Sequence, residues 1–301
     1  MNNIIRTCMS ALGVYYLKTQ YITFLKKYFP KKAANKFHKG MTGRNINWKH
    51  PLDLNEKINW LKFNSDTSLW SEYADKYLVR NYVVEQGLQD ILPTLYGVWD
   101  NAEDIEFDKL PAQYVLKTNH GCGTNIIVTN SSKLDRQKTI RHLNDYLKLK
   151  FGFDTAEPHY MKIKPRIIAE QYLKPKNGKL CDYKLFMINQ KLELILVVSD
   201  RQGSSYRLST YDEEWSLVPE RLDGAHKNDN VKPLPRPASF TKMVKSAQIL
   251  SQGFPQVRID FYDIDGKLYF GEMTFTSQGG YMNYLSHKEL LRMGQLINLQ
   301  K

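Results

Sequence analysis

The chain has 301 residues, and 42% of them are hydrophobic, which is enough to bury a core in one large domain or two ordinary ones. With 25% charged residues and a net charge of +12, the composition argues against intrinsic disorder, a collagen-like fibre and a polytopic membrane protein. Its three cysteines, Cys8, Cys122 and Cys181, are too few and too scattered for a disulfide framework or a cysteine-based zinc site, and they suit a reducing compartment.

The positive charge is concentrated in residues 1–50, which we treat as a basic N-terminal arm. The arm holds ten lysines and arginines and no aspartate or glutamate, so it leaves only +2 for the rest of the chain. Because the remainder is nearly neutral, a nucleic-acid-binding protein with a basic body is disfavoured. The longest apolar run of the arm, residues 11–17, is shorter than the ~18–20 residues of a bilayer span.

An amphipathic helix is expected in the arm, with Pro30 ending its pattern. Three interpretations stay open: the helix packs on the protein's own body, it lies on an anionic membrane surface through residues 1–40, or it binds RNA. No aromatic stacking motif supports the third. The apolar stripe consists of Ile4, Cys8, Ala11, Tyr15, Ile22, Leu25 and Phe29, and the lysines at its end are Lys26, Lys27, Lys31 and Lys32.

After the arm, the pattern changes from helical to strand-rich near residue 111. Residues 54–62 have helical spacing, and a second helix is predicted to start near Ser71 and to continue to Val83. Further helices are predicted at 136–150 and at 241–253, the last with Gly253 as its C-cap. The predicted strands are residues 95–99, 114–117, 126–129, 167–172, 182–189, 192–199, 257–262 and 268–273.

Two pairs of these strands form predicted hairpins, with turns at Asn189-Gln190 and at residues 263–266. Residues 201–238 are rich in proline, glycine and charge, so we expect an irregular insertion or an active-site loop there. Helices mixed with antiparallel hairpins favour an α+β fold over a doubly wound parallel sheet.

Two carboxylates lie on the last predicted hairpin. Asp260 and Glu272 stand on adjacent antiparallel strands and can point to the same face. Such a pair is a hard oxygen site suited to Mg²⁺, which keeps waters and phosphate oxygens as its other ligands. Two acids in a hairpin are commonly an ordinary surface feature, but the Thr-Ser-Gln-Gly-Gly that follows at 276–280 resembles a loop that approaches phosphate.

A second candidate site is a lysine at a strand end, Lys117, followed by a turn with Gly121 and Gly123. Backbone N–H groups of such a turn can hold phosphate, and the lysine adds a positive charge. The spacing excludes a Walker A loop, and no helix opens at the glycines as it does in a Rossmann fingerprint. Cys122 is interpreted as a small filler, whereas His120 is either structural or a contact to phosphate or substrate.

Three weaker signals complete the set. They are Asp75-Lys76 with Arg80 on a predicted helix, a strand ending in Glu170-Gln-Tyr-Leu173, and Asp182-Tyr-Lys184. The backbone edge of the strand that ends at Glu170–Leu173 could pair with an adenine ring. Each alone is more often an ordinary strand or a salt-bridged surface.

Together, and in their order along the chain, the five stretches resemble the ATP-grasp superfamily, and more closely the TupA-like ATP-grasp family, named for a teichuronopeptide biosynthesis protein. The resemblance runs from about Pro51 to Leu296. It rests on the strings Asn55-Glu-Lys-Ile-Asn-Trp-Leu-Lys62, Ala74-Asp-Lys-Tyr-Leu-Val-Arg80, Leu110-Pro-Ala-Gln-Tyr-Val-Leu-Lys-Thr-Asn-His-Gly121, Asp182-Tyr-Lys-Leu-Phe186, Ser199-Asp-Arg201 and Phe270-Gly-Glu-Met-Thr-Phe275.

The resemblance implies an ATP-grasp fold, in which two α+β subdomains clasp ATP, preceded by a helical N-terminal region. The expected divisions are the arm at 1–50, the helical region at 51–110, a small subdomain with the glycine-rich turn at 111–175, and a C-terminal subdomain with the metal site at 176–301.

The resemblance also implies the nucleotide contacts. Lys76 and Lys117 would hold phosphates under the glycine turn, Lys184 would lie near the β and γ phosphates, and Glu170 with the backbone after it would meet adenine. The full expected set is Lys76, Lys117, His120, Gly121, Gly123, Thr124, Glu170, Gln171, Tyr172, Leu173 and Lys184.

The implied metal and catalytic residues are Asp260, Glu272 and Arg258. The two acids would hold Mg²⁺, usually as a pair of ions bridged by the glutamate, and Arg258 with Lys184 would stabilise developing charge. The superfamily commonly has asparagine two residues after the glutamate. In this chain Thr274 stands at that position. A threonine hydroxyl can ligate Mg²⁺ but has a shorter reach than asparagine, so binding of a second ion depends on whether Thr274 reaches it.

The implied activity is ATP-dependent joining of a carboxylate to an amine through an acyl phosphate. The family context implies a lipid-linked precursor of a surface polysaccharide, an amino acid or peptide as co-substrate, and a cytoplasmic enzyme at the inner face of the membrane. Arg201 is expected to receive a carboxylate or an anionic sugar, with His226, Arg207 and Arg236 as weaker candidates. The alternatives are a glycosyltransferase, a sugar kinase, a non-catalytic ATP-binding scaffold and an RNA-binding protein.

Overall fold

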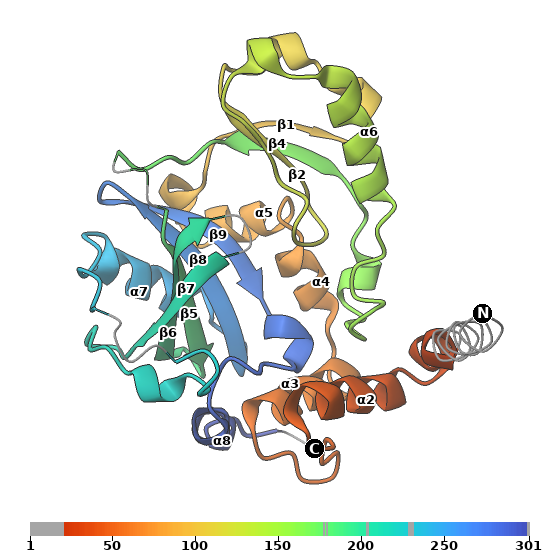
Figure 1. Ribbon diagram of the computed structural model, residues 1–301, viewed down its shortest axis with the longest axis vertical. Helices are drawn as coiled ribbons and strands as arrows, with labels where there is room; N and C mark the ends of the chain where they lie inside the picture. The colour runs from red at the N-terminus through yellow and green to blue at the C-terminus, as the bar shows by residue number, and fades with distance from the viewer. Residues whose placement is uncertain (1–20, 177, 179, 203–204, 228–231, 300–301) are drawn as a thin grey trace, which may run out of the picture.

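Two antiparallel sheets with surrounding helices form the protein, as the computed structural model of residues 21–176, 178, 180–202, 205–227 and 232–299 shows (Figure 1). The smaller sheet has the strand order β1-β4-β2-β3, and the larger has β7-β6-β5-β8-β9. The predicted α+β class is confirmed. The hairpins put neighbouring strands next to each other. The small sheet packs on one buried cluster, whereas the large sheet has a buried cluster on each of its two faces.

The small sheet carries α6 (Arg136–Leu147) on one face, at the top of Figure 1. Leu143 of this helix packs with Leu116 and Ile167 of the sheet in one buried cluster. The strand predicted at residues 95–99 is confirmed as β1, which pairs antiparallel with β4 and so joins this sheet. Its strands are β1 (Leu95–Trp99), β2 (Tyr114–Thr118), β3 (Ile126–Val128) and β4 (Ile167–Gln171).

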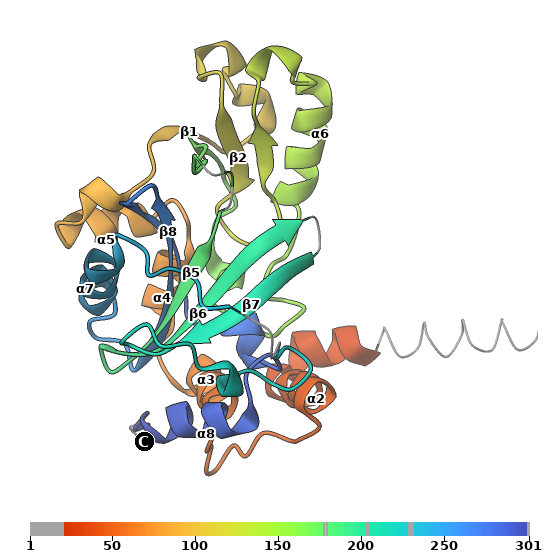
Figure 2. The same cartoon turned by 60° about the vertical axis from the view of Figure 1, so that its left-hand side comes forward.

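The large sheet carries α7 (Phe240–Leu250), which contacts β5, β6 and β8 (Figure 2). Both predicted hairpins are confirmed. Asn189 and Gln190 have φ of +49° and +65°, and Asp265 and Gly266 have φ of +53° and +87°, as two-residue hairpin turns require. Its strands are β5 (Asp182–Ile188), β6 (Lys191–Gln202), β7 (Ser205–Tyr211), β8 (Gln256–Ile264) and β9 (Lys267–Thr274).

The prediction of irregular structure throughout 201–238 was wrong for β7, which pairs antiparallel with β6 from Ser205 to Tyr211. The prolines and most of the irregular chain come after this strand. Averaging composition over the whole range therefore concealed seven residues that an adjacent long strand can pair.

The prediction of one helix from Ser71 to Val83 was also wrong. The chain forms α4 (Ser68–Ala74) and α5 (Val79–Glu85) with a break between them. The Asp75 carboxylate accepts hydrogen bonds from the backbone N–H groups of Tyr77 (2.8 Å) and Leu78 (3.2 Å), which competes with helix continuation. The break leaves Lys76 in a loop, free to face the small sheet.

In the arm, the helical pattern ends before Pro30, as expected, and Pro30 also begins a second helix that was not predicted. Residues 21–28 are helical, and α2 (Pro30–Thr42) follows with proline in its first turn, where no N–H partner is needed. Ala34 of α2 packs with Ile46 and Tyr281 of the body. The part of the predicted stripe before residue 21 lies outside the described residues. No helix in the described part of the chain is long and apolar enough to cross a membrane.

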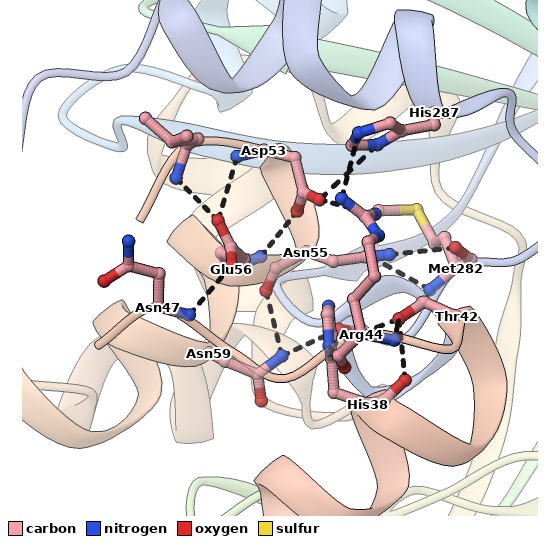
Figure 3. Close-up of polar contacts among 12 residues, drawn as sticks. His38, Thr42, Arg44, Asn47, Asp53, Asn55, Glu56, Asn59, Met282 and His287 are labelled. Carbon is pink, nitrogen blue, oxygen red and sulfur yellow. Dashed lines mark hydrogen bonds and ion pairs between the residues drawn. The ribbon is translucent and has the colours of Figure 1, made fainter. Parts of the chain in front are cut away.

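Three helices meet below the large sheet: α2, α3 (Leu54–Asn64) and α8 (His287–Gln295), the last not predicted (Figures 1 and 3). Asp53 caps α3 by accepting from the backbone N–H of Glu56 at 2.9 Å, and Glu56 reaches back to the Asp53 N–H at 3.4 Å. Arg44, which follows α2, donates to the Asp53 carboxylate at 2.9 Å. Its guanidinium also lies 2.9 Å from the ring Nε2 of His287, the first residue of α8.

Polar side chains of α3 hold the backbone that follows β9. Asn55 donates to the Met282 carbonyl (2.8 Å) and accepts from the Met282 N–H (2.9 Å), as Figure 3 shows. Asn59 donates to the Gly280 carbonyl at 2.7 Å, and Lys62 donates to the Gly279 carbonyl at 2.8 Å. The helix therefore fixes residues 279–282, two of which, Gly279 and Gly280, have positive φ.

His159 lies fully buried near this backbone, 5.6 Å from the Trp70 ring, with Nε2 3.5 Å from the Thr276 hydroxyl. Burial, helped by the charge of Lys62, lowers the pKa of His159 to about 3 from 6.5. The folded state thus keeps the His159 ring neutral. The stability that this group contributes is fully present above pH 6.5 and is lost as the pH falls toward 3.

We expect the free energy of unfolding to fall by about 2 kcal/mol between pH 7 and pH 5 because of His159 alone. His159→Gln, which cannot titrate, should have a smaller loss over this range. Urea unfolding of both proteins at the two pH values measures the difference. Equal losses in the two proteins would show that His159 does not carry this acid sensitivity.

Candidate active site

A cavity of about 230 Å³ lies between the two sheets, with walls from both. The small sheet contributes the ends of β2 and β4 and the glycine turn. The large sheet contributes β5, β8 and β9, and the loop between α4 and α5 adds Lys76. Eleven of the predicted site residues line this cavity: Lys76, Lys117, Gly121, Gly123, Glu170, Gln171, Tyr172, Leu173, Lys184, Asp260 and Glu272.

Two other predicted nucleotide residues do not line the cavity. His120 is buried, with its ring Nε2 3.1 Å from the Leu149 carbonyl, and Thr124 is held by the backbone N–H and hydroxyl of Thr118 at 3.2 and 2.9 Å. Both side chains support the glycine turn from behind. Gly121 in this turn has no room for a side chain, because a Cβ would come within 2.3 Å of the Phe151 ring.

The lysines on the small-sheet side are already paired with acids. Lys76 Nζ donates to the Gly121 carbonyl at 2.5 Å and lies 3.4 Å from Glu272 Oε2, so it bridges the two walls. Lys117 Nζ lies 2.5 Å from Glu170 Oε2, and Arg80 donates to the other oxygen of Glu170 at 3.1 Å. These ion pairs place positive charge along one side of the cavity.

The opposite wall holds the two predicted metal acids. Asp260 and Glu272 are direct partners across the β8–β9 pair, and Lys184 is the partner of Asp260 on β5. Lys184 Nζ lies 2.5 Å from Asp260 Oδ2. A bulge directly follows the acid pair, and Gly271 occupies it, since a Cβ there would lie 2.9 Å from the Asp260 carbonyl oxygen.

Arg258 joins this acid pair from the side. Its guanidinium donates to both oxygens of Asp260 at 2.6 and 2.8 Å, and to Glu272 at 3.1 Å. It also donates to the hydroxyls of Thr274 (3.0 Å) and Ser277 (3.3 Å). Neither Arg258 nor Thr274 lines the cavity itself. The arginine therefore connects the acids to the loop after β9.

The charges at this wall shift one another's pKa values. Desolvation opposes the charged form of Glu272, but Lys76, Arg258 and Lys184 outweigh it and hold the pKa of Glu272 below its ordinary value. Burial likewise opposes the charge on Lys184, and Asp260 overcomes it, so the pKa of Lys184 is raised. Both groups are therefore charged at neutral pH.

These residues fit a magnesium ion that completes its coordination with phosphate. Two carboxylates converge on one point, and their donor atoms are the hard oxygens that Mg²⁺ prefers. Within the described ranges, no group of three or more histidines, cysteines, aspartates or glutamates could hold a metal on its own. The Thr274 hydroxyl lies 3.3 Å from Glu272 Oε1.

Asp182 was missed as a site residue. It lines the cavity, and one of its oxygens lies 2.7 Å from Lys184 Nζ. Its other oxygen is buried with no hydrogen-bond partner among the described residues, and burial raises its pKa. Asp182 stands two residues before Lys184 on β5, so the period of a strand puts both on one face and could have identified it.

Arg201 lies apart from the cavity walls. It is exposed near the end of β6, with its guanidinium 5.7 Å from the Tyr206 ring. Its charge still reaches Tyr262, a cavity residue, where it opposes the strong rise in pKa that burial causes. Arg201 is thus placed beside the cavity rather than within it.

The two sheets face a shared cavity. One sheet contributes lysines with a glycine turn, and the other contributes a lysine with paired acids. This arrangement defines an ATP-grasp protein. A model of the family described as TupA-like ATPgrasp matches residues 56–298. The chain belongs to the TupA-like ATP-grasp family. A comparison with curated proteins finds no match.

Solved structures with a similar chain path include three ligases. L-amino acid ligase from Bacillus licheniformis has 12% identity, a TM-score of 0.49, and coverage of 90% of this chain and 61% of that one. D-alanine–D-alanine ligase from Helicobacter pylori has 14% identity, a TM-score of 0.45, and coverage of 81% of this chain and 69% of that one. D-alanine–D-alanine ligase from Bacillus anthracis, complexed with ATP, has 15% identity, a TM-score of 0.40, and coverage of 74% of this chain and 57% of that one. The chain thus spans between 57% and 69% of the length of these proteins.

Proposed function

We propose that the protein is an ATP-dependent ligase that joins a carboxylate to an amine. The observation that carries this proposal is the cavity, where Lys76 and Lys117 face the acids Asp260 and Glu272, and Lys184 joins these acids from the neighbouring strand of their own sheet. Phosphates bind best where lysines and backbone N–H groups converge. Family membership over residues 56–298 supports the same interpretation.

The two halves of the cavity suggest how ATP lies. The adenine would lie against the end of β4, where Glu170 and the backbone of residues 171–173 line the wall together with apolar side chains. The triphosphate would extend toward Lys76, Lys117 and Lys184. When bound, Mg²⁺ held by Asp260 and Glu272 would neutralise phosphate charge and hold the phosphates in line. Whether one or two ions bind depends on Thr274.

The proposed reaction has two transfers. A carboxylate oxygen of one substrate attacks the γ-phosphorus, the bond from that phosphorus to the bridging oxygen of ADP breaks, and an acyl phosphate forms. The amine nitrogen of the second substrate then attacks the acyl carbon, phosphate leaves, and the nitrogen loses a proton to give the amide. Arg258 and Lys184 would stabilise the negative charge that develops, so the protein acts mainly by positioning and charge.

The substrate class follows from the family resemblance. We assign a precursor of a surface polysaccharide, lipid-linked at the inner face of the membrane, with a uronic-acid carboxylate or an amino sugar as the reacting group. An amino acid or peptide would be the co-substrate. Arg201 would receive an anionic sugar, and its exposed position supports this role. The protein would work in the cytoplasm.

An ADP-release screen with Mg²⁺ tests this function. Amino acids are paired with uronic-acid and amino-sugar acceptors, and the product mass is then measured. We expect ADP, phosphate and an amide product. ADP with a phosphorylated sugar would instead indicate a kinase, and release of a nucleoside diphosphate from a sugar donor without ATP would indicate a glycosyltransferase. Absence of any turnover would leave the scaffold interpretation.

A further inference from the structure

An exposed cluster of aromatic rings lies on the helical residues 21–28 and the start of α2. The fractional exposures of Tyr21, Phe24, Tyr28 and Phe29 are 54%, 49%, 56% and 43%. Phe24 contacts two of the other rings, with centroids 5.1 Å apart for Phe24 and Tyr28 and 5.7 Å apart for Phe24 and Phe29. We call these four residues the aromatic face. Contiguous exposed apolar surface of this kind marks an interaction site.

Lysines surround the aromatic face. Lys27 Nζ lies 5.0 Å from the Tyr28 ring centroid, Lys32 Nζ 4.9 Å from that of Phe29, and Lys36 Nζ 5.0 Å from that of Tyr21. All three lysines are exposed. The arm contains no acid that could neutralise them. The partner of this surface is therefore expected to be anionic and to offer an apolar layer to the rings.

The body of the protein holds the aromatic face outward. On the other side of the same helical segment, Leu25 is buried, and Lys26 Nζ lies 2.5 Å from Asp154 Oδ1 and 5.7 Å from the Phe153 ring centroid. One side of the segment thus packs on the protein while the other remains in solvent. Packing on the body and binding to an external surface are compatible for this arm.

We infer that the aromatic face and its three lysines bind the surface of an anionic bilayer. Aromatic rings favour the interfacial layer of a membrane, and lysines beside them attract anionic headgroups. RNA fits less well, because the rings pack on one another rather than standing apart as stacking platforms, and the rest of the chain carries only +2. The inference concerns a surface outside the nucleotide cavity and does not depend on the ligase activity.

Flotation of the full-length protein with vesicles tests the inference. The probes are vesicles of phosphatidylcholine with phosphatidylglycerol, vesicles of phosphatidylcholine alone, and a single-stranded RNA oligomer at the same salt concentration. We expect binding to the anionic vesicles, weakening as salt is raised, and little binding to the neutral vesicles or the RNA.

Two variants locate the binding surface. Lys27→Gln, Lys32→Gln and Lys36→Gln together should weaken binding on the order of 100-fold, at about fivefold for each lysine. Phe24→Ser, Tyr28→Ser and Phe29→Ser together should also release the protein from vesicles while its thermal unfolding midpoint stays unchanged, because these side chains are exposed. The matched control changes Lys133, Lys138 and Lys150, exposed lysines of the small-sheet half, to glutamine and should bind like the wild type.

Either of two results would overturn the inference. One is vesicle binding that both triple variants retain. The other is preference for the RNA over the anionic vesicles in the unchanged protein. Neither result depends on ATP turnover, so the proposed ligase function and this inference can fail separately.

Discussion

Asp260→Asn and Glu272→Gln are each expected to lower Mg²⁺-dependent ATP turnover by at least about 100-fold, the loss typical of removing one electrostatic group from a preorganised site. Both changes keep the shape of the side chain and remove its negative charge. Asp260 is buried and bonds both Arg258 and Lys184, so its replacement also leaves two cations with less compensation. ADP release at saturating Mg²⁺ measures the effect.

Folding must be intact for this result to identify the metal site. The thermal unfolding midpoint of each variant therefore accompanies the turnover measurement, and Glu214→Gln, at an exposed position between β7 and α7, provides a charge-matched control with full activity expected. Retention of turnover by both Asp260→Asn and Glu272→Gln would show that the assignment of these acids to the metal is wrong.

Asn55→Leu is expected to lower the free energy of unfolding by about 2–6 kcal/mol. The side chain is fully buried and satisfies both the N–H and the carbonyl of Met282. Leucine fills similar space but leaves these two buried groups unpaired, and each costs about 1–3 kcal/mol. Urea unfolding measures the loss from the shift of the transition midpoint.

A control on the same helix separates burial from general effects on α3. Asn64 is exposed at the last turn and bonds the exposed Lys31 at 2.9 Å, so Asn64→Ala should change the free energy of unfolding by no more than about 0.5 kcal/mol. If the two variants lose equal stability, the contact between Asn55 and Met282 is not what holds the loop after β9.

Much of the fold was predictable because its strands carry local patterns. The hairpin of β8 and β9 brings its own acids together, so Asp260 and Glu272 could be paired from sequence alone. The position of Lys184 beside Asp260 could not, because it requires β5 to pair with a strand some seventy residues later. Non-local pairing thus decided the part of the site that local patterns left open.

The failures have local physical causes. Asp75 interrupts a helical pattern by accepting hydrogen bonds from the backbone N–H groups that follow it, and the helix that begins at Pro30 was not predicted although proline suits a helix start. In the arm, the apolar period was found but its orientation was not: Leu25 faces the body, whereas Phe29 is exposed. The two residues belong to one predicted stripe, but the helix over residues 21–28 ends before Phe29, so the period does not continue to it.

The ion pairs at and beside the cavity walls bear on how ATP and Mg²⁺ would bind. Four cations (Lys76, Lys117, Lys184 and Arg258) face four acids (Glu170, Asp182, Asp260 and Glu272). A free triphosphate that enters must take lysines from their acids and then lie beside the carboxylates it has uncovered. A divalent cation arriving alone must in turn displace Lys184 and Arg258. Each ligand removes the obstacle to the other, so the two are expected to bind with positive cooperativity, each raising the affinity of the other by the same factor.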